Sequence, residues 1–398
     1  MKKLSVDQIE LKGKRVLVRV DFNVPFAADG SIRDDIRIRE ALPTIRKILD
    51  GGGKAVLMSH LGRPKGKPNP EFSLKPVANH LSKLLQKPVQ FAHDCIGAEV
   101  EQQVSALQAG DCILLENLRF HAEEEKNDPS FAAALARLGD VYVNDAFGTA
   151  HRAHASTEGI TRYFRQNAAG YLMQKELDFL GGALENPERP FVAILGGAKI
   201  SGKIEVIQNL LKKVDSLLIG GGMAFAFLKA KGLEIGASLF EPETLDVAKS
   251  ILQQAQEAKV ELLLPVDAVI AEKLEPTAKT RIVPSDQIES GWMGVDIGPE
   301  TAKRYRSRIV SAKTAVWNGP MGVFEIDSFA AGTKVVAHAL TEATAKGAVT
   351  IVGGGDSAAA VKQFGYESGV SHVSTGGGAS LEFFEGKILP GVAVLTDA

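Results

Sequence analysis

Short apolar runs alternate with amphipathic stretches along the whole chain. The runs are rich in β-branched residues and lie at 16–20, 55–58, 112–115 and 141–143 in the first half, and at 191–195, 217–219, 261–264, 314–317, 349–352 and 372–373 in the second half. The stretches between them, such as 131–138 and 201–214, carry apolar residues at helical spacing. Strands that alternate with helices form a parallel sheet covered on both faces, and its buried strands are continuously apolar. The pattern therefore predicts an α/β fold.

The number of predicted strands exceeds what one such sheet usually needs. The chain has 398 residues, whereas a single hydrophobic core rarely extends past ~250–300 residues. The stretch 171–184 has leucines at helical spacing and is followed by the turn-rich segment 185–190 (ENPERP). We therefore expect two α/β domains with their junction there. The alternative is a single large sheet in which this helix is one more crossover.

Composition and charge exclude several classes of protein. Hydrophobic residues make up 45% and charged residues 24%, as in an ordinary globular protein. Forty-six basic and 48 acidic side chains give a net charge of −2, so the electrostatic footprint of a general nucleic-acid binder is missing. The charged N-terminus lacks the apolar core of a signal peptide. The longest uncharged apolar stretch, 216–228, is interrupted by glycines, so we expect no membrane span and a cytoplasmic protein. Cys95 and Cys112 are too few for a disulfide framework, and we expect both to be reduced and half-buried.

Polar and basic side chains follow the predicted strands of the first half. In open parallel sheets, ligands bind at the carboxyl ends of the strands. The residues at these strand ends, together with an arginine at an early helix start, are Asp21, Asn23, Arg37, His60, Arg63, Arg119 and Arg152. Guanidinium groups bind phosphate or carboxylate through two parallel hydrogen bonds. We therefore expect a cleft for a small polyanion, with Asp21 and Asn23 suited to substrate hydroxyls.

The basic residues and histidines of the first half also have interpretations other than a polyanion site. Taken singly, each side chain is better explained by a solvated surface than by a ligand, whereas four such sets, each directly after a buried strand, favour a binding site. His151 and His154 (HRAH) have the residue type of metal ligands, but no third Cys, His or carboxylate stands at ligand spacing. His80 and His338 lie in helical stretches, and we expect them to be structural.

The strand ends of the second half are rich in glycine. The chain has 40 glycines, about 10% against an average of ~7%. They cluster at 196–202, 220–222, 319–322, 353–355 and 376–378. Glycine lets backbone N–H groups approach a phosphate closely, and a helix that starts there adds a positive dipole end. Lys199 and Lys203 supply charge for phosphate, and Asp356 suits Mg²⁺. The second half therefore predicts a nucleotide site with bridging Mg²⁺.

Two look-alike motifs favour other functions. Segment 197–203 (GAKISGK) has the spacing of a phosphate-binding loop of the Walker A type, but Ile204 stands where that motif needs Ser or Thr. Segment 353–358 fits the loose dinucleotide pattern G-x-G-x-x-A, but the next strand ends in Ser374 and Thr375, without an acidic residue for the ribose. An NAD-dependent dehydrogenase and a non-enzymatic sensor of a phosphorylated acid remain as alternatives.

Seven motifs, in order and spacing, resemble the phosphoglycerate kinase family from residue 15 to residue 394. They are 18–25 (VRVDFNVP), 60–64 (HLGRP), 145–156 (DAFGTAHRAHAS), 195–199 (LGGAK), 317–325 (WNGPMGVFE), 353–358 (GGGDSA) and 374–381 (STGGGASL). Two positions depart from the family pattern: Gly202 stands where a polar residue is commoner, and Val295 replaces a commoner Leu. Lys199 and Lys203 are both kept.

The resemblance implies an architecture and a reaction. It implies two Rossmann-like three-layer domains with parallel sheets, joined by a helical hinge around 171–184. The acid-substrate domain would be 1–170 with 381–398 returning to it, the linker helix 171–185 and the nucleotide domain 186–380. The reaction would be the Mg²⁺-dependent, reversible transfer of a phosphoryl group between ATP and the carboxylate of 3-phosphoglycerate, giving ADP and 1,3-bisphosphoglycerate, in line and after domain closure. The implied partners are these small molecules, with no nucleic acid and no membrane, and we expect a monomer.

The resemblance also implies roles for single residues. The acid and its 3-phosphate would be bound by Asp21, Asn23, Arg37, His60, Arg63, Arg119 and Arg152, with Arg37 nearest the reacting carboxylate. The migrating phosphoryl group would be held by Lys199 and the backbone amides of Gly354, Gly355, Gly376 and Gly377. The nucleotide would be bound by Lys203, Gly220, Gly236, Gly294, Asn318, Glu325, Gly354, Gly355, Asp356 and Ser357. Of these, Asp356 would hold Mg²⁺, Glu325 the ribose hydroxyls, and Gly220, Gly236 and Gly294 would line the adenine slot.

Overall fold

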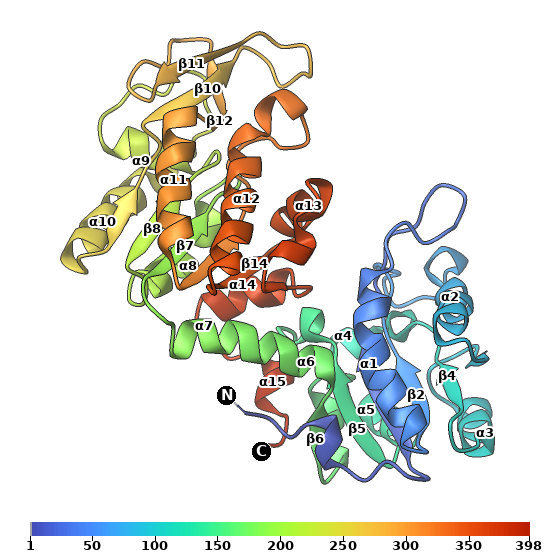
Figure 1. Cartoon of the computed structure of the whole chain (residues 1–398). Coiled ribbons are helices and arrows are strands. Elements are labelled where there is room, and N and C mark those ends of the chain that lie inside the picture. Colours follow the sequence, from blue (N-terminus) through green and yellow to red (C-terminus); the bar gives the residue numbers. More distant parts are fainter. Residues whose placement is uncertain (1) are drawn as a thin grey trace. The chain divides into compact units, whose positions relative to one another are not determined.

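The computed structural model describes residues 2–398, which divide into two compact units. The first unit runs to Asp178 and includes Ile388–Ala398, and the second unit is Phe179–Lys387. Each unit contains a six-stranded sheet covered by helices (Figure 1). All strand pairs within these two sheets are parallel. The predicted α/β class with two parallel sheets is therefore confirmed.

The division between the units falls inside the helical stretch expected at the junction. This stretch consists of α6 (Tyr171–Glu176), a π-helical turn (Leu177–Gly181) and α7 (Gly182–Glu185), and the units divide after Asp178. The C-terminal segment rejoins the first unit at Ile388, later than the expected residue 381. The physical reason is that α14 (Gly378–Phe384) packs in the second unit, where the Asn209 side chain donates to the Phe384 carbonyl over 2.7 Å.

The sheet of the first unit has the strand order β3-β4-β2-β1-β5-β6. The strands are β1 (Arg15–Val20), β2 (Lys54–Met58), β3 (Val89–Phe91), β4 (Cys112–Leu114), β5 (Val141–Asp145) and β6 (Asn167–Ala169). The helices are α1 (Ile36–Asp50), α2 (Lys75–Leu85), α3 (Ala98–Ala106), α4 (Ala122–Glu125), α5 (Pro129–Ala136), α6 and α15 (Pro390–Ala393). The edge strands β3 and β6 were not predicted, because three residues that include Gln90 or Asn167 form no apolar run.

The core of the first unit explains why β1 is continuously apolar. Val16, Val18 and Val20 are fully buried and belong to one core cluster with Ile45 of α1 and Leu81 of α2. Burying apolar surface yields roughly 25 cal/mol per Å². This core holds the carboxyl ends of β1, β2 and β5 in fixed positions, and the polar residues that follow these strands are placed accordingly.

The sheet of the second unit has the strand order β15-β14-β13-β7-β8-β9. The strands are β7 (Phe191–Leu195), β8 (Ser216–Ile219), β9 (Glu261–Leu263), β13 (Thr314–Asn318), β14 (Val349–Gly353) and β15 (His372–Val373). The helices are α7, α8 (Ile204–Leu210), α9 (Ala224–Ala230), α10 (Leu245–Glu257), α11 (Pro299–Ser311), α12 (Ala331–Ala345), α13 (Gly355–Gln363) and α14. The helix expected over 201–214 is shorter than predicted, because Ser201–Lys203 forms a 3-10 turn before α8 begins.

The second unit also carries a small antiparallel sheet that the sequence pattern did not predict. Its strands are β10 (Asp267–Ala271), β11 (Thr280–Pro284) and β12 (Met293–Ile297), in the order β11-β10-β12. The outer strand β11 is largely exposed, so it lacks the apolar run of a buried strand. Strand β12 of this sheet carries Gly294, which we expect to line the adenine slot.

Two smaller expectations can be compared with the fold. Cys95 and Cys112 are free, as expected, but they are buried at 0% and 2% exposure rather than half-buried. Cys112 is buried because it begins β4, which lies between β3 and β2 in the sheet. Across residues 2–398, the structure contains no helix with the length and apolar character that crossing a bilayer requires.

Candidate functional site

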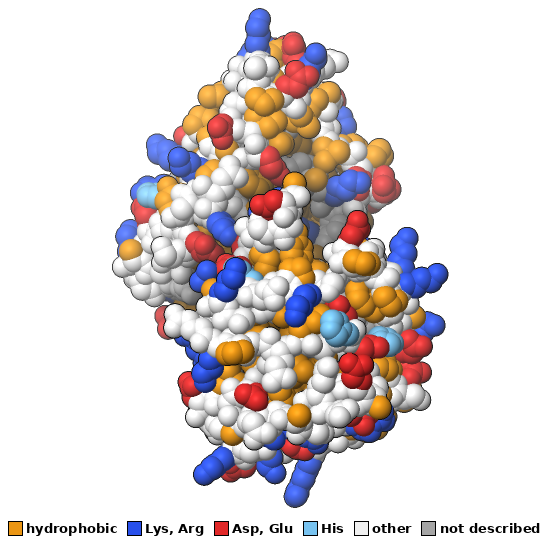
Figure 2. Space-filling model, turned by 90° about the vertical axis from the view of Figure 1, so that its right-hand side faces the viewer, with side chains coloured by type: hydrophobic (Ala, Val, Ile, Leu, Met, Phe, Trp, Pro, Cys, Tyr) orange, Lys and Arg blue, Asp and Glu red, His pale blue; other side chains and the backbone are white. Residues whose placement is uncertain are grey.

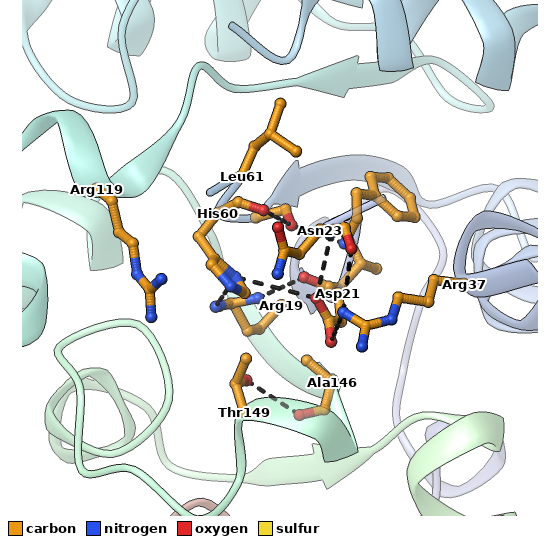
Figure 3. A network of polar contacts seen from close by, with 12 residues as sticks. Arg19, Asp21, Asn23, Arg37, His60, Leu61, Arg119, Ala146 and Thr149 are labelled. Carbon is orange, nitrogen blue, oxygen red and sulfur yellow. Dashed lines mark hydrogen bonds and ion pairs between the residues drawn. The ribbon is translucent and has the colours of Figure 1, made fainter. Parts of the chain in front are cut away.

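The carboxyl ends of β1 and β2 bring together the first part of a polar set. Asp21 and Asn23 follow β1, and Arg37 lies in the first turn of α1. The Arg37 guanidinium donates to the Asp21 carboxylate over 3.0 Å and to the Asn23 carbonyl over 3.1 Å. The Asn23 side-chain oxygen accepts from the backbone N–H of Gly62 over 2.9 Å, which ties the end of β1 to the loop after β2. Figure 3 shows Asp21, Asn23 and Arg37 grouped beside His60.

His60 is held in one tautomer by a buried arginine. The Arg19 guanidinium lies 3.2 Å from His60 Nδ1. Arginine only donates hydrogen bonds, so Nδ1 accepts and the proton of the neutral ring is on Nε2. Burial, and then the charges of Arg19 and Arg119, hold the pKa of His60 well below its usual range. His60 is therefore a neutral hydrogen-bond donor at pH 7.

A buried polar network behind His60 was missed by the sequence reasoning. Arg19 is 1% exposed and donates to Ser156 Oγ over 2.8 Å. The Ser156 hydroxyl and backbone N–H donate to the carboxylate of Glu124, which is fully buried. Burial raises the pKa of Glu124, whereas the charge of Arg19 lowers it. The available signal was an arginine inside the otherwise apolar run of β1.

The remaining arginines of the set differ in how they are held. Arg119 is 5% exposed and donates to the Gly62 carbonyl over 2.9 Å, and burial lowers the pKa of its guanidinium. Arg152 is half-buried and donates to the ring of His151 over 3.1 Å. Arg63 is exposed and forms no ion pair with another residue in the described range 2–398. Figure 3 shows Arg119 and Arg37 on opposite sides of His60 and Asp21.

The two histidines weighed as metal ligands do not form a metal cluster. Within residues 2–398, the single group of three or more metal-ligating side chains with converging ligand atoms is Asp94, Cys95 and His121. His154 lies 3.9 Å from Glu124, and burial lowers the pKa of His154 to about 3, so it is neutral at pH 7. His80 is half-buried beside Asp35 at 2.8 Å.

The second unit contains a cavity of about 320 Å³ beside its glycine-rich strand ends. Gly294, Glu325 and Asp356 line it, as does the apolar ring of Phe225. Gly220 and Gly236, which we expect to line the adenine slot, do not line this cavity. A Cβ at Gly220 would lie 2.4 Å from Met321 Sδ, and one at Gly236 would lie 2.4 Å from two backbone oxygens, so both glycines serve close packing. Gly221 and Gly222 line the cavity in their place.

The two lysines of the second unit are held differently. Lys199 Nζ lies 3.3 Å from the Glu241 carboxylate, and its side chain is 60% exposed. Lys203 Nζ is buried and donates to the carbonyls of Gly196 and Asn318 over 2.8 and 2.7 Å, and to Asn318 Oδ1 over 2.6 Å. Burial lowers the pKa of Lys203 to about 8. Lys203 therefore joins the ends of β7 and β13 and does not occupy an open phosphate-binding loop of the Walker A type.

Helix starts in the second unit position the remaining predicted residues. Gly354, with φ +90°, precedes α13, and Asp356 lies in the exposed first turn of that helix. Ser357 is buried and its hydroxyl accepts from the Gly319 N–H over 2.6 Å, next to Asn318. Gly377, with φ +52°, precedes α14, whereas the Gly376 N–H is already bonded to Ser374 Oγ over 3.1 Å. A positive φ favours glycine, which explains Gly354 and Gly377.

The surface carries no broad basic patch on the face seen in Figure 2. Lys and Arg side chains are interspersed with Asp and Glu there. Affinity for a nucleic-acid backbone would require a continuous basic surface. The guanidinium groups of Arg19, Arg37 and Arg119 all lie near His60 at the strand ends of the first unit, which suits a small anion.

Comparison with known proteins decides the family. A model of the phosphoglycerate kinase family matches residues 6–387. The curated phosphoglycerate kinases of Chloroherpeton thalassium and Chlorobaculum tepidum are 62% and 61% identical to this chain over 398 and 397 residues, and 100% of each chain is covered. The chain belongs to the phosphoglycerate kinase family.

Solved structures agree with this family. The structure of phosphoglycerate kinase from Coxiella burnetii matches with a TM-score of 0.89 and 45% identity, and the crystal structure of the enzyme from Pyrococcus horikoshii OT3 with a TM-score of 0.81 and 33% identity. Both alignments cover 98% of each chain. Membership of the phosphoglycerate kinase family displaces the dehydrogenase and sensor alternatives. Of the two family departures, Gly202 has open space where a side chain would stand, and Val295 is 3% exposed.

Proposed function

We propose that this protein catalyses reversible phosphoryl transfer between ATP and the carboxylate of 3-phosphoglycerate, giving ADP and 1,3-bisphosphoglycerate, as a step of glycolysis. The observation that carries the proposal is the match to one kinase family over residues 6–387. Two local features support it. The first unit holds basic and neutral donors at the strand ends, and the second holds a glycine-lined cavity with an exposed carboxylate.

The proposed acid site is the set around His60 in the first unit. Arg37, Arg63, Arg119 and Arg152 would neutralise the 3-phosphate and carboxylate, with Arg37 nearest the reacting oxygen. Supporting this, the Arg37 side chain is 31% exposed and has only part of its donor capacity taken by Asp21 and Asn23. His60 would donate from Nε2, and Asp21 and Asn23 would bind hydroxyls.

The proposed nucleotide site is the cavity of the second unit. Gly294 and apolar neighbours would hold the base, and Glu325 would accept from the ribose hydroxyls. Lys203, Asn318, Ser357 and the amides of Gly354 and Gly355 would hold the phosphates, directly or by keeping the strand ends in place. The start of a helix favours phosphate through its unpaired N–H groups and its dipole.

The residues present fit a magnesium ion. Mg²⁺ binds through one or two carboxylates together with phosphate oxygens. Asp356 offers an exposed carboxylate on the first turn of α13, and Glu325 lines the same cavity. When bound, Mg²⁺ supplies charge neutralisation at the phosphate oxygens. We propose Asp356 as its protein ligand.

No general base is required for the proposed transfer. A carboxylate is already ionised at pH 7, and phosphoryl transfer depends mainly on positioning and charge neutralisation. Lys199 would leave Glu241 and follow the migrating group, supported by its 60% exposure. The amides of Gly354, Gly355 and Gly377 would stabilise the charge in the transition state, and the Gly376 N–H would join them on leaving Ser374 Oγ. Because the acid set and the nucleotide set belong to different units, the proposed transfer includes a closure step that aligns the two substrates.

The test is ATP consumption by the purified chain with Mg²⁺, with and without 3-phosphoglycerate. We expect turnover that depends on the acid. Lys199→Met should lower kcat by about 100-fold or more, as expected for loss of a transition-state contact. Lys212→Met is the matched control, because Lys212 is an exposed lysine after α8 and should leave the rate unchanged. Equal ATP consumption without the acid would indicate a hydrolase, and no consumption would overturn the proposal.

We further propose that the enzyme acts in the cytoplasm as a monomer. The two free cysteines support a reducing compartment. Light scattering coupled to size-exclusion chromatography measures the mass directly. A dimer at micromolar concentration would contradict the monomer.

A further inference from the structure

Three metal-ligating side chains meet outside the proposed substrate sites, in two adjacent loops of the first unit. β3 and β4 are parallel neighbours, with Phe91 paired to Leu114, so the loops that follow them leave the same edge of the sheet. The loop after β3 carries Asp94 and Cys95, and the loop after β4 carries His121. One imidazole nitrogen of His121, a carboxylate oxygen of Asp94 and the thiol Sγ of Cys95 all lie within 4.8 Å of one another.

The contacts within this cluster already converge on one carboxylate. Asp94 Oδ1 lies 2.7 Å from His121 Nε2 and accepts from the Cys95 N–H over 2.6 Å. The His121 ring is oriented by Phe131, whose ring centroid is 5.2 Å away. The positions of the three side chains are therefore set before any ion binds, which lowers the entropy cost of binding.

We propose that Asp94, Cys95 and His121 form a binding site for a borderline-soft divalent cation of the Zn²⁺ class. One nitrogen, one oxygen and one sulfur ligand suit Zn²⁺ or Co²⁺, whereas Mg²⁺ and Ca²⁺ select oxygen ligands. The site is distinct from Asp356, which lies in the second unit. It adds a metal that the phosphoryl transfer does not use.

Charge and exposure fit this type of ion. A divalent cation with one carboxylate, one thiolate and one neutral imidazole gives a net charge of zero, which suits a half-buried position. Cys95 is 0% exposed, whereas the Asp94 and His121 side chains are 52% and 27% exposed. The buried sulfur forms the inner wall, and the ion reaches the site from the solvent side, where water completes a tetrahedral set. Binding releases the thiol proton to solvent. The proton between His121 Nε2 and the Asp94 carboxylate also leaves Nε2, to solvent from a doubly protonated ring or to Nδ1 in a neutral ring, so the bound imidazole carries its single proton on Nδ1.

Cobalt titration of the tag-free, full-length chain without nucleotide tests the proposal. Co²⁺ bound to a thiolate gives a charge-transfer absorption band in the near ultraviolet. Adding Zn²⁺ should displace the Co²⁺ and abolish this band. We expect one Co²⁺ per chain with this band. Cys95→Ser should remove the band, and His121→Gln should weaken binding by about ten-fold or more, as for loss of a metal contact. Zn²⁺ should also raise the thermal midpoint of the wild type but not of His121→Gln.

Two control variants make the test specific. Cys112→Ser removes the other buried thiol, and His93→Gln removes a histidine next to the cluster, so both should bind Co²⁺ as the wild type does. If Cys95→Ser fails to fold, the test relies on His121→Gln. The His121 side chain is partly exposed, so we expect that variant to fold. A band that is absent from the folded wild type, or that survives in Cys95→Ser, would refute the site. Loss of the band in Cys112→Ser would place the thiolate elsewhere and also refute it.

Discussion

Two arginines on one strand give a sharp test of the buried network behind His60. Arg19 and Arg15 both lie on β1, and each is linked to an acidic side chain. Arg19 is 1% exposed and reaches the fully buried Glu124 through Ser156. Arg15 binds Asp140 directly, and the two side chains are 28% and 37% exposed. Comparing substitutions of Arg19 and Arg15 therefore separates the effect of burial on stability from the effect of charge.

Arg19→Met keeps the length of the side chain and removes its charge and donors. It leaves Glu124 buried without its cation and Ser156 and His60 without a donor. Removing one partner of a buried charge network costs about 3–5 kcal/mol, whereas an exposed pair contributes about 0.2–1 kcal/mol. We expect urea denaturation to show this contrast between Arg19→Met and Arg15→Met. Equal costs below about 1 kcal/mol would refute the reasoning.

The loss of folding stability caused by Arg19→Met should also depend on pH. Burial raises the pKa of the Glu124 carboxyl in the folded state, and Arg19 opposes this. In the variant the folded pKa rises further, so the folded state binds more protons than the unfolded state over a wider range. Stability then falls as pH rises through this range, and the deficit against wild type should be larger at pH 8 than at pH 5. Arg19→Met should also raise the KM for 3-phosphoglycerate and leave that for ATP unchanged, since His60 loses its fixed tautomer. A pH-independent deficit would argue against the coupling.

Four further variants test other parts of the molecule. Burial raises the pKa of Asp145 to about 6 from 3.8, so the contribution of this group to stability should fall by about 3 kcal/mol as pH rises from about 4 to about 6; Asp145→Asn, which still accepts from the α6 amides, should remove this contribution from the pH dependence measured by urea denaturation. Arg37→Ala should lower kcat far more than it raises the KM for ATP, and steady-state kinetics that show lost acid affinity alone would contradict its catalytic position. Asp356→Ala should shift the Mg²⁺ dependence of the rate, and an unchanged dependence would remove Asp356 from the metal site. Gly294→Ala places a Cβ 2.0 Å from Phe225 Cζ, so it should raise the KM for ATP but not for the acid; equal changes in both would indicate general damage.

Patterns that are local in the chain were sufficient to predict much of this protein. Buried parallel strands such as β1 and β7 are continuous apolar runs, because both faces of each strand are covered by helices. Ligand-binding residues of such sheets follow the strands directly, so Asp21, His60 and Asp356 could be named as candidates from their places in the sequence. The motifs that resemble the phosphoglycerate kinase family include these same three positions.

Other features depended on contacts between segments distant in sequence. The small sheet β10–β12 is partly exposed and lacks an apolar run, so its pairing follows from packing against its neighbours. The family resemblance implied that Gly220 lines the adenine slot, but Met321, 101 positions later, fills the space beside it. Likewise, the exposure of Arg63 and the burial of Arg119 arise from what covers each loop.

The buried groups show most clearly what only the tertiary structure decided. Arg19, Ser156 and Glu124 are ordinary polar residues in the sequence, and Cys95 and His121 are separated by 25 residues between them. Strand order places the loops after β3 and β4 together and sets Arg19 against His60. The periodicity of apolar residues along a chain indicates which face of a helix or strand is buried. A polar contact between distant residues depends instead on which helices and strands are neighbours. The sequence by itself therefore determined the continuously apolar strands and the polar residues that follow them, and the packing of the sheet determined which polar groups meet.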